Sequence, residues 1–77
     1  MMVLPARIAT KLVVQEISAR DYTYCRETKR IRLYRNGKHM VPITKSATMF
    51  EATARSILGQ CGLTQEQIEA CIKKAGD

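Results

Sequence analysis

The dipeptide Asn36-Gly37 constrains the fold more than any other feature, because a run containing alternating apolar residues stands on each side of it. The two runs are residues 30–34 and 40–43. Asn-Gly between such runs is the strongest short-range signal for a β-hairpin, since both residues tolerate a positive φ. The middle of the chain is therefore predicted to form two antiparallel strands.

The side-chain pattern of the two runs predicts the length of the loop between them. Their aliphatic residues, all at odd-numbered positions, are Ile31, Leu33, Val41 and Ile43. A two-residue loop would pair Arg35 with Lys38 and would send the two aliphatic sets to opposite faces of the hairpin. A three-residue loop over 35–37, closed by a G1 bulge, pairs Ile31 with Val41 instead and places all four on one face. We therefore predict the three-residue loop.

The predicted register gives the hairpin a basic second face. That face would display Arg30, Arg32, Tyr34, Lys38 and Met40. Residues 26–38 hold six basic side chains against one acid, Glu27, so this segment carries five of the six net positive charges of the chain. Charge concentrated on one surface attracts a phosphate backbone. A nucleic acid is the expected partner.

The C-terminal half contains two helix patterns joined almost without a linker. Thr48 and Glu51 have the spacing of a capping box, which predicts a helix over 49–61 that Gly62 ends. Its apolar stripe comprises Phe50, Ala54, Ile57, Leu58 and Cys61.

A second helix is predicted to begin after Thr64, with Gln67 as its capping partner and Gly76 at its end. Leu63 and Ile68 occupy the two positions of a hydrophobic staple. The apolar stripe of this helix comprises Ile68, Cys71, Ile72 and Ala75.

The N-terminal third predicts a helix and a strand. Residues 22–26 read as a third strand, and residues 6–19 fit an amphipathic helix with Pro5 in its first turn. Thr10, Leu12 and Val14 could also alternate as one face of a strand, but the helix is favoured. The fold class is therefore α+β in the order α-β-β-β-α-α, with a three-stranded antiparallel sheet packed on helices. A chain of 8.7 kDa has room for one small core, so residues 1–77 form a single domain.

Composition excludes several other classes of protein. No apolar run approaches the roughly 20 residues that cross a bilayer, and no leader pattern precedes the domain, so a cytoplasmic location is expected. The three cysteines, Cys25, Cys61 and Cys71, lack the C-x2-C spacing of a zinc site and are expected to be small, buried, reduced residues. No glycine-rich phosphate loop is present, and no cofactor or metal is expected.

One segment resembles a known family. The sequence RSILGQCGLT at 55–64 is similar to the C-terminal helix and turn of HicA family toxins, which carry a TLRSILKQAGLS-like stretch after a short sheet. The segments MVPI at 40–43 and LYR at 33–35 also resemble strands of that family, and the likeness extends over roughly residues 6–70. It implies a fold similar to a double-stranded RNA-binding domain, cleavage of mRNA in a toxin-antitoxin system, and a HicB-like antitoxin protein as a partner.

The chain also departs from the HicA pattern. Arg26 and Glu27 still fall where the family tends to have an Arg-Gln pair, but residues 29–31 replace the Gly-Ser-His segment that holds the family's catalytic histidine. A ribonuclease needs a general base whose pKa lies near working pH, and histidine is the usual supplier. His39 is the only histidine of the chain and hence the only candidate base for a metal-independent endoribonuclease. Its predicted position is on the same side as Leu33.

These observations predict a HicA-like RNA-binding protein, either a divergent mRNA interferase or one that has lost cleavage. The predicted RNA contacts are Arg26, Lys29, Arg30, Arg32, Tyr34, Arg35 and Lys38, the tyrosine by stacking and the others on phosphates.

Two other classes of function remain open. The basic hairpin also suits a small viral or plasmid-encoded inhibitor that docks on an acidic protein. Residues 57–71 resemble a helix-turn-helix, which would make the chain a DNA-binding regulator. The presumed recognition helix, however, carries Glu66 and Glu69 and no basic residue between 65 and 72.

Overall fold

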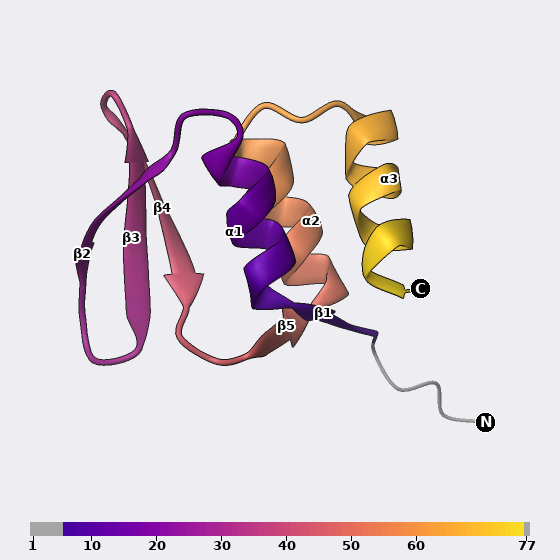
Figure 1. Cartoon of the computed structure of the whole chain (residues 1–77), viewed down its shortest axis with the longest axis horizontal. Helices are drawn as coiled ribbons and strands as arrows, with labels where there is room; N and C mark the ends of the chain where they lie inside the picture. Colours follow the sequence, from indigo (N-terminus) through magenta and orange to yellow (C-terminus); the bar gives the residue numbers. More distant parts are fainter. Residues whose placement is uncertain (1–5, 77) are drawn as a thin grey trace.

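The computed structural model describes residues 6–76 of the chain. Its elements in order are β1 (Arg7–Ala9), α1 (Thr10–Ser18), β2 (Thr23–Glu27), β3 (Ile31–Asn36), β4 (His39–Thr44), β5 (Thr48–Phe50), α2 (Glu51–Gln60) and α3 (Gln65–Gly76) (Figure 1). The predicted α+β class and the order of helices and long strands are confirmed. The short strands β1 and β5 are an addition that the sequence did not indicate.

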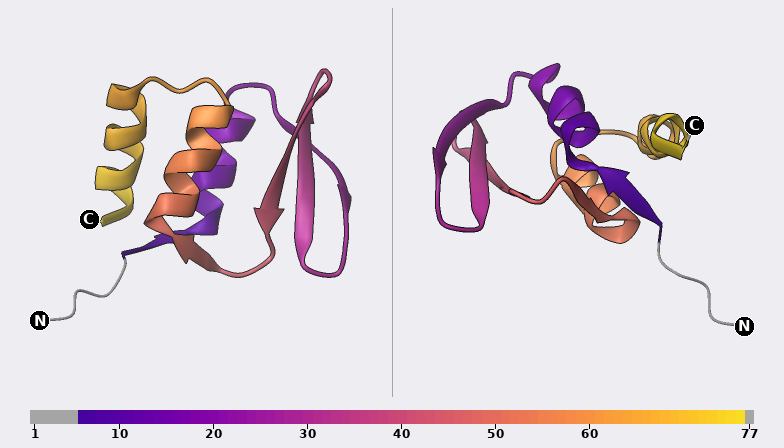
Figure 2. Two further views of the ribbon diagram at one scale, coloured as in Figure 1. Left: turned by 180° about the vertical axis from the view of Figure 1, so that it is seen from behind. Right: turned by 60° about the horizontal axis from the view of Figure 1, so that its bottom comes forward.

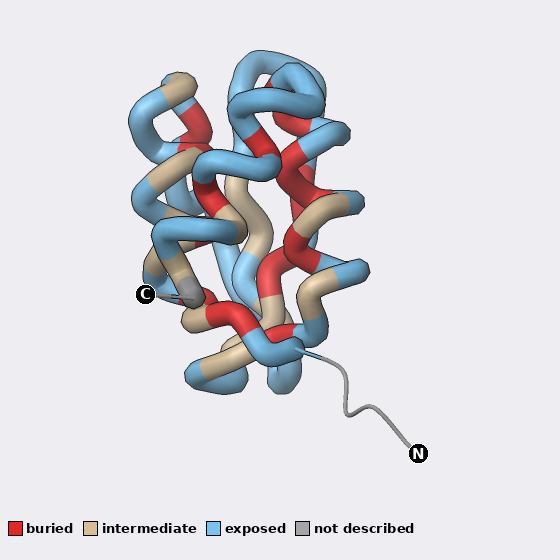
Figure 3. Tube along the Cα trace, turned by 90° about the vertical axis from the view of Figure 1, so that its right-hand side faces the viewer, coloured by how far each residue is buried: buried red, intermediate tan, exposed pale blue. Residues whose placement is uncertain are grey.

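The long strands form an antiparallel sheet in the order β2-β3-β4. Helices α1 and α2 cover one face of this sheet, and α3 packs on the side of these helices that lies away from it (Figure 2). The side chains with the least exposure are Val13, Ile17, Val41, Ile43 and Leu58, so the core lies between β4 and the first two helices. Figure 3 shows this buried zone between the exposed outer turns of the helices.

The strands β1 and β5 pair as a two-stranded ribbon at one end of the helices, with Ile8 opposite Met49. Thr48 therefore lies in a strand, and the prediction that it caps α2 is wrong. The N-cap is Phe50, which makes no side-chain capping bond, while the Thr48 hydroxyl accepts a hydrogen bond of 2.8 Å from Arg7. Phe50 is exposed under the Arg7 guanidinium, 4.5 Å from its ring centroid, and is not part of the apolar stripe of α2.

The predicted N-terminal helix is confirmed for Thr10–Ser18, where the strand alternative is wrong. Residues 7–9, also predicted to be helical, form β1 because they pair with a strand about 40 residues further along the chain. Pro5, predicted in the first helical turn, lies outside the described residues.

The junction between α2 and α3 follows the sequence prediction. Gly62 adopts a φ of 90°, and its N–H donates to the Gly59 carbonyl at 3.1 Å while that of Leu63 donates to Leu58 at 3.2 Å. These two bonds form a Schellman motif. The residue just after the helix in this motif has a positive φ, which glycine adopts without strain.

The capping box that begins α3 is also confirmed. The Thr64 hydroxyl accepts a bond of 3.2 Å from the Gln67 N–H, and the Gln67 side chain accepts one of 2.8 Å from the Thr64 N–H. The stripe of α3 faces the core, because Ile68 and Cys71 are buried and Ile72 and Ala75 pack against them.

The hairpin forms, but the predicted register is wrong. Asn36 pairs with His39, so the loop is the two residues Gly37-Lys38. Gly37 has a φ of 61°, and Lys38 has no positive φ. A positive φ at the first central residue alone is the requirement of a type II′ turn, which suits the twist of a hairpin.

The observed register divides the four aliphatic residues between the two faces of the sheet. Val41 and Ile43 face the helices and are buried, and their cross-strand partners are Tyr34 and Arg32. Helix α1 meets the sheet chiefly at β4. On β3, Tyr34 is half-buried and packs against the core.

Strand β2 is an edge strand whose five residues are all exposed. It covers Thr23–Glu27, one residue later than predicted, and a β-bulge at Cys25 interrupts its pairing between Tyr24 and Arg26. Cys25 lies in this exposed strand, so the expectation that all three cysteines are buried is wrong for this one. A bulge on an edge strand also hinders pairing with another chain.

We expect Gly37→Ala to lower the free energy of unfolding by roughly 1–2 kcal/mol, the cost of holding a side-chain-bearing residue at positive φ. The matched control is Gly59→Ala inside α2, where the new methyl group would lie 3.9 Å from Ile68. That variant is expected to gain about 1 kcal/mol of helix propensity. Urea unfolding of both variants measures the difference, and equal stability of the two would contradict the positive φ of Gly37.

Candidate nucleic-acid interface

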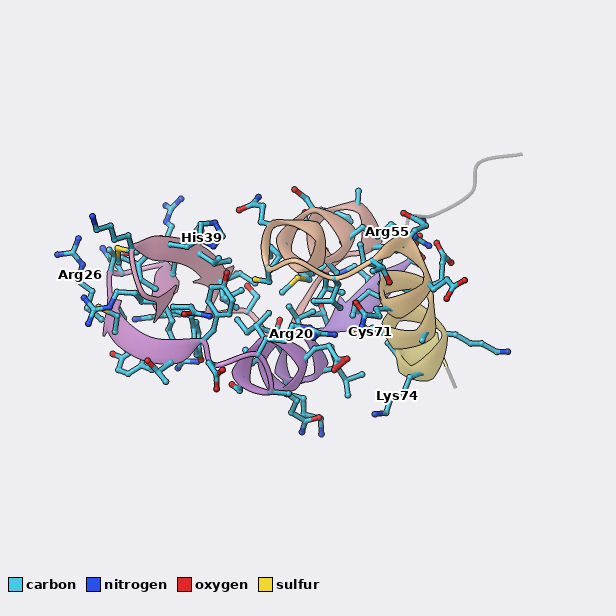
Figure 4. The ribbon with its side chains drawn as sticks, turned by 90° about the horizontal axis from the view of Figure 1, so that it is seen from above. Arg20, Arg26, His39, Arg55, Cys71 and Lys74 are labelled. Atoms are coloured by element: carbon cyan, nitrogen blue, oxygen red, sulfur yellow. The ribbon has the colours of Figure 1, made fainter. Side chains whose placement is uncertain are left out.

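The distal face of the sheet, which points away from the helices, is made by Arg26, Ile31, Leu33, Arg35, Met40 and Pro42. These residues share a side because cross-strand partners lie on the same face: Leu33 pairs with both Arg26 and Pro42, and Arg35 pairs with Met40. Figure 4 shows Arg26 directed away from the helices. The face therefore combines two arginines with apolar side chains.

Five of the seven predicted RNA contacts are exposed cations that form no ion pair within the described part of the chain. They are Arg26 and Arg35 on the distal face, Lys29 and Arg30 in the turn between β2 and β3, and Lys38 in the hairpin turn. The two turns lie at opposite ends of β3. The unpaired charge thus borders the distal face at both ends.

The other two predicted contacts, Arg32 and Tyr34, lie on the helix-facing side of the sheet. The prediction that Arg32 and Tyr34 share a face with Met40 is therefore wrong. The physical reason is the two-residue turn, which shifts the register by an odd number of residues and exchanges the faces of one strand relative to the other. Arg32 is also partly neutralised, since its Nε lies 3.8 Å from the Glu27 carboxylate.

Three side chains contact the Glu27 carboxylate on the helix-facing side of β2. The Lys45 ammonium donates to Oε2 at 2.6 Å, the Tyr24 hydroxyl donates to Oε1 at 3.0 Å, and Arg32 completes the group. The bonds from Lys45 and Tyr24 lower the pKa of Glu27 below its ordinary value. The bond to Glu27 in turn raises the pKa of the Tyr24 hydroxyl.

A groove of about 590 Å³ separates the start of α1 from the helix-facing side of the sheet. Three cations line it, namely Lys11 on α1, Arg32 on β3 and Lys45 after β4. Tyr34 and Val14 supply its apolar wall. Sequence reasoning missed Lys11 and Lys45 because each is a single basic residue outside the charged segment, and nothing local indicates that they meet Arg32.

His39 lies on the same side as Val41, opposite Asn36, and the prediction that placed it with Leu33 is wrong. Its Nδ1 shares a hydrogen bond of 2.6 Å with the hydroxyl of Tyr22, whose ring contacts the imidazole edge-to-face. Tyr22 is buried, and burial raises the pKa of its hydroxyl. One imidazole nitrogen is therefore held by the core, while the ring itself is exposed.

Burial raises the pKa of the thiols of Cys61 and Cys71, which are packed in the core as predicted. Among the described residues no three histidine, cysteine or acidic side chains gather as a group that could hold a metal ion. None of the helices between residues 6 and 76 combines the length and the hydropathy needed to cross a membrane.

Neither the protein-family models nor the curated proteins compared with this sequence match it. The likeness to HicA toxins therefore rests on the sequence segments described above and on nothing further.

Thiol labelling tests the unequal environments of the cysteines. At pH 8 we expect a disulfide reagent to modify one thiol per native chain quickly, Cys25, and all three after unfolding. Cys61 and Cys71 should react slowly, because burial shields their thiols from the reagent and disfavours the thiolate form. In Cys25→Ser the fast phase should disappear. A fast phase that survives in that variant would contradict the packing of α2 and α3.

Proposed function

We propose that this chain binds RNA through its distal face and the two adjoining turns, as a HicA-like protein of a toxin-antitoxin type system in the reducing cytoplasm. The observation that carries the proposal is the group of five exposed cations without a carboxylate partner, Arg26, Lys29, Arg30, Arg35 and Lys38. Their charge is available to phosphates, because no acid of the described chain competes for it.

The composition of the distal face defines the kind of recognition. It carries arginines and aliphatic side chains but no aromatic ring on which a base could stack. Tyr34, predicted to stack on a base, lies on the other side of the sheet and packs against the core. Contacts with phosphate and ribose then dominate, which gives binding with weak sequence preference and strong salt dependence.

The apolar part of the distal face favours a protein as a second partner. Ile31 and Leu33 are half-buried, and Met40 and Pro42 are exposed, between Arg26 and Arg35. An antitoxin of the HicB type, with acidic side chains around an apolar centre, would cover this surface and block RNA at the same time. The same features suit an acidic protein target, the alternative in which the chain acts as an inhibitor.

Binding of DNA through α3 has less support. Near the start of α3, Glu69 is engaged with Arg55 of α2 and also accepts a bond from Gln65. A recognition helix needs free donors at its N-terminal end, where it meets base edges. Here that end carries two acids, and one of them, Glu69, is already paired within the chain.

The charge-removing pair Arg26→Gln/Arg35→Gln tests the RNA surface. We expect it to weaken binding of a single-stranded 12-nucleotide RNA measured by fluorescence anisotropy. Its plot of log affinity against log salt should lose about 1.4 units of slope, at about 0.7 per phosphate contact. Lys73→Gln/Lys74→Gln removes the same charge from α3 and should change neither quantity by as much.

Equal losses in the two double variants would mean that net charge, and not the distal face, attracts the RNA. Failure of the wild type to bind single- or double-stranded RNA at low salt, together with tight binding to one acidic protein, would replace the RNA proposal by the inhibitor alternative.

The proposal covers binding and leaves cleavage to a separate test of His39. Because its Nδ1 is shared with the buried Tyr22, we expect the ring to act in packing, and the wild type to leave RNA intact over hours. The measurement is RNA integrity on a gel beside His39→Ala. Cleavage by the wild type that is lost in His39→Ala, with RNA binding retained, would instead identify His39 as a general base.

A further inference from the structure

The groove between α1 and the sheet lies on the opposite side of the sheet from the distal face and has the size of a small-molecule site. Its volume of about 590 Å³ falls within the range typical of ligand pockets. Lys11, Arg32 and Lys45 line it, and no acidic residue does. A groove with three cations and no acid in its lining is suited to a ligand that carries negative charge.

An oxyanion of the chain already contacts two of the cations that line this groove. The Glu27 carboxylate accepts hydrogen bonds from Lys45 and Tyr24 and pairs with Arg32, so donors from three separate segments converge on one anionic group. Two of these three donors, Lys45 and Arg32, also line the groove. A phosphate presents the same kind of oxygen acceptor with one more oxygen and more charge.

We propose that this groove binds the phosphate group of a nucleotide on Lys45 and Arg32, and that Glu27 competes with the ligand for these two donors. Lys11, from the opposite wall, faces the same space and adds a third positive charge to the two that Glu27 contacts. With Glu27 in place the four charged groups sum to a net charge of +2. This sum leaves the site attractive to a phosphate dianion.

The apolar wall favours a phosphate that is attached to a ring. Tyr34 lines the groove and packs against the core, and its ring meets that of Tyr24 edge-to-face with centroids 6.1 Å apart. Val14 of α1 lines the groove as well. A nucleobase or a ribose gains contact with these side chains, whereas inorganic phosphate uses the charged rim alone.

Glu27 is placed where a ligand can displace it. It is the last residue of the edge strand β2, and its side chain is 45% exposed while it pairs with Lys45 and Arg32. Exposed ion pairs are weak, so rotating the Glu27 carboxylate out into the solvent costs little free energy. Removing its charge should therefore strengthen binding of a phosphate, while removing Lys45 should weaken it.

Titration with adenosine monophosphate, followed by amide chemical shifts, tests the proposal on the full chain. We expect saturable shifts around Arg32 and Lys45 in the wild type, about fivefold tighter binding in Glu27→Gln, and loss of binding in Lys45→Gln. Glu66→Gln removes an exposed acid from α3 and is the control, in which affinity stays at the wild-type value. The amide spectrum of each variant shows that it is folded.

Adenosine and inorganic phosphate separate the two parts of the ligand, and the expected order of affinity is monophosphate, then phosphate, then adenosine. Comparison of a 5′-phosphorylated with a 5′-hydroxyl RNA hexamer decides whether the phosphate comes from a free nucleotide or from an RNA end. Equal binding of adenosine and its monophosphate, or no gain in Glu27→Gln, would overturn the proposal. Arg26→Gln/Arg35→Gln should leave monophosphate binding unchanged, so failure of the groove and failure of the RNA surface are distinguishable.

Discussion

The two-residue turn Gly37-Lys38 is the constraint on which the arrangement of this chain depends. Gly37 stands first in it with a positive φ, and the length of the turn sets the register of β3 against β4. Side chains alternate across a strand, so this single choice decides which residues of β3 face the helices. Arg32 and Tyr34 turn inward as a result, while Leu33 and Arg35 turn outward.

The register therefore produces two cationic surfaces in place of one. On the distal face, Arg26 and Arg35 stand free among aliphatic side chains, a composition that suits an extended polyanion or an acidic protein. On the helix-facing side, Arg32 and Lys45 both contact the Glu27 carboxylate, and both line a groove. A confined site with its own competing anion is better suited to a small phosphate ligand. The two surfaces invite different partners because the sheet separates them.

The core supports these surfaces unequally. Its tightest packing lies between β4 and the first two helices, whereas β2, at the far edge, has no buried residue. Glu27 and Arg26 are thus carried by the least buried strand of the sheet. Elements with few buried contacts open most readily, so exchange of Glu27 for a ligand requires no disturbance of the core.

Local interactions let the sequence alone determine the two C-terminal helices, because the Gly62 stop and the reciprocal Thr64–Gln67 cap involve residues within a few positions of each other. The hairpin itself was equally evident. Its register was not, because a glycine with positive φ at position 37 suits both the predicted three-residue loop and the observed two-residue turn, and the structure divides the four aliphatic residues between two faces. Only the tertiary structure brought β1 against β5, took Thr48 from the helix into a strand, and assembled the groove from Lys11, Arg32 and Lys45. Those contacts join segments far apart along the chain, and no short-range pattern encodes them.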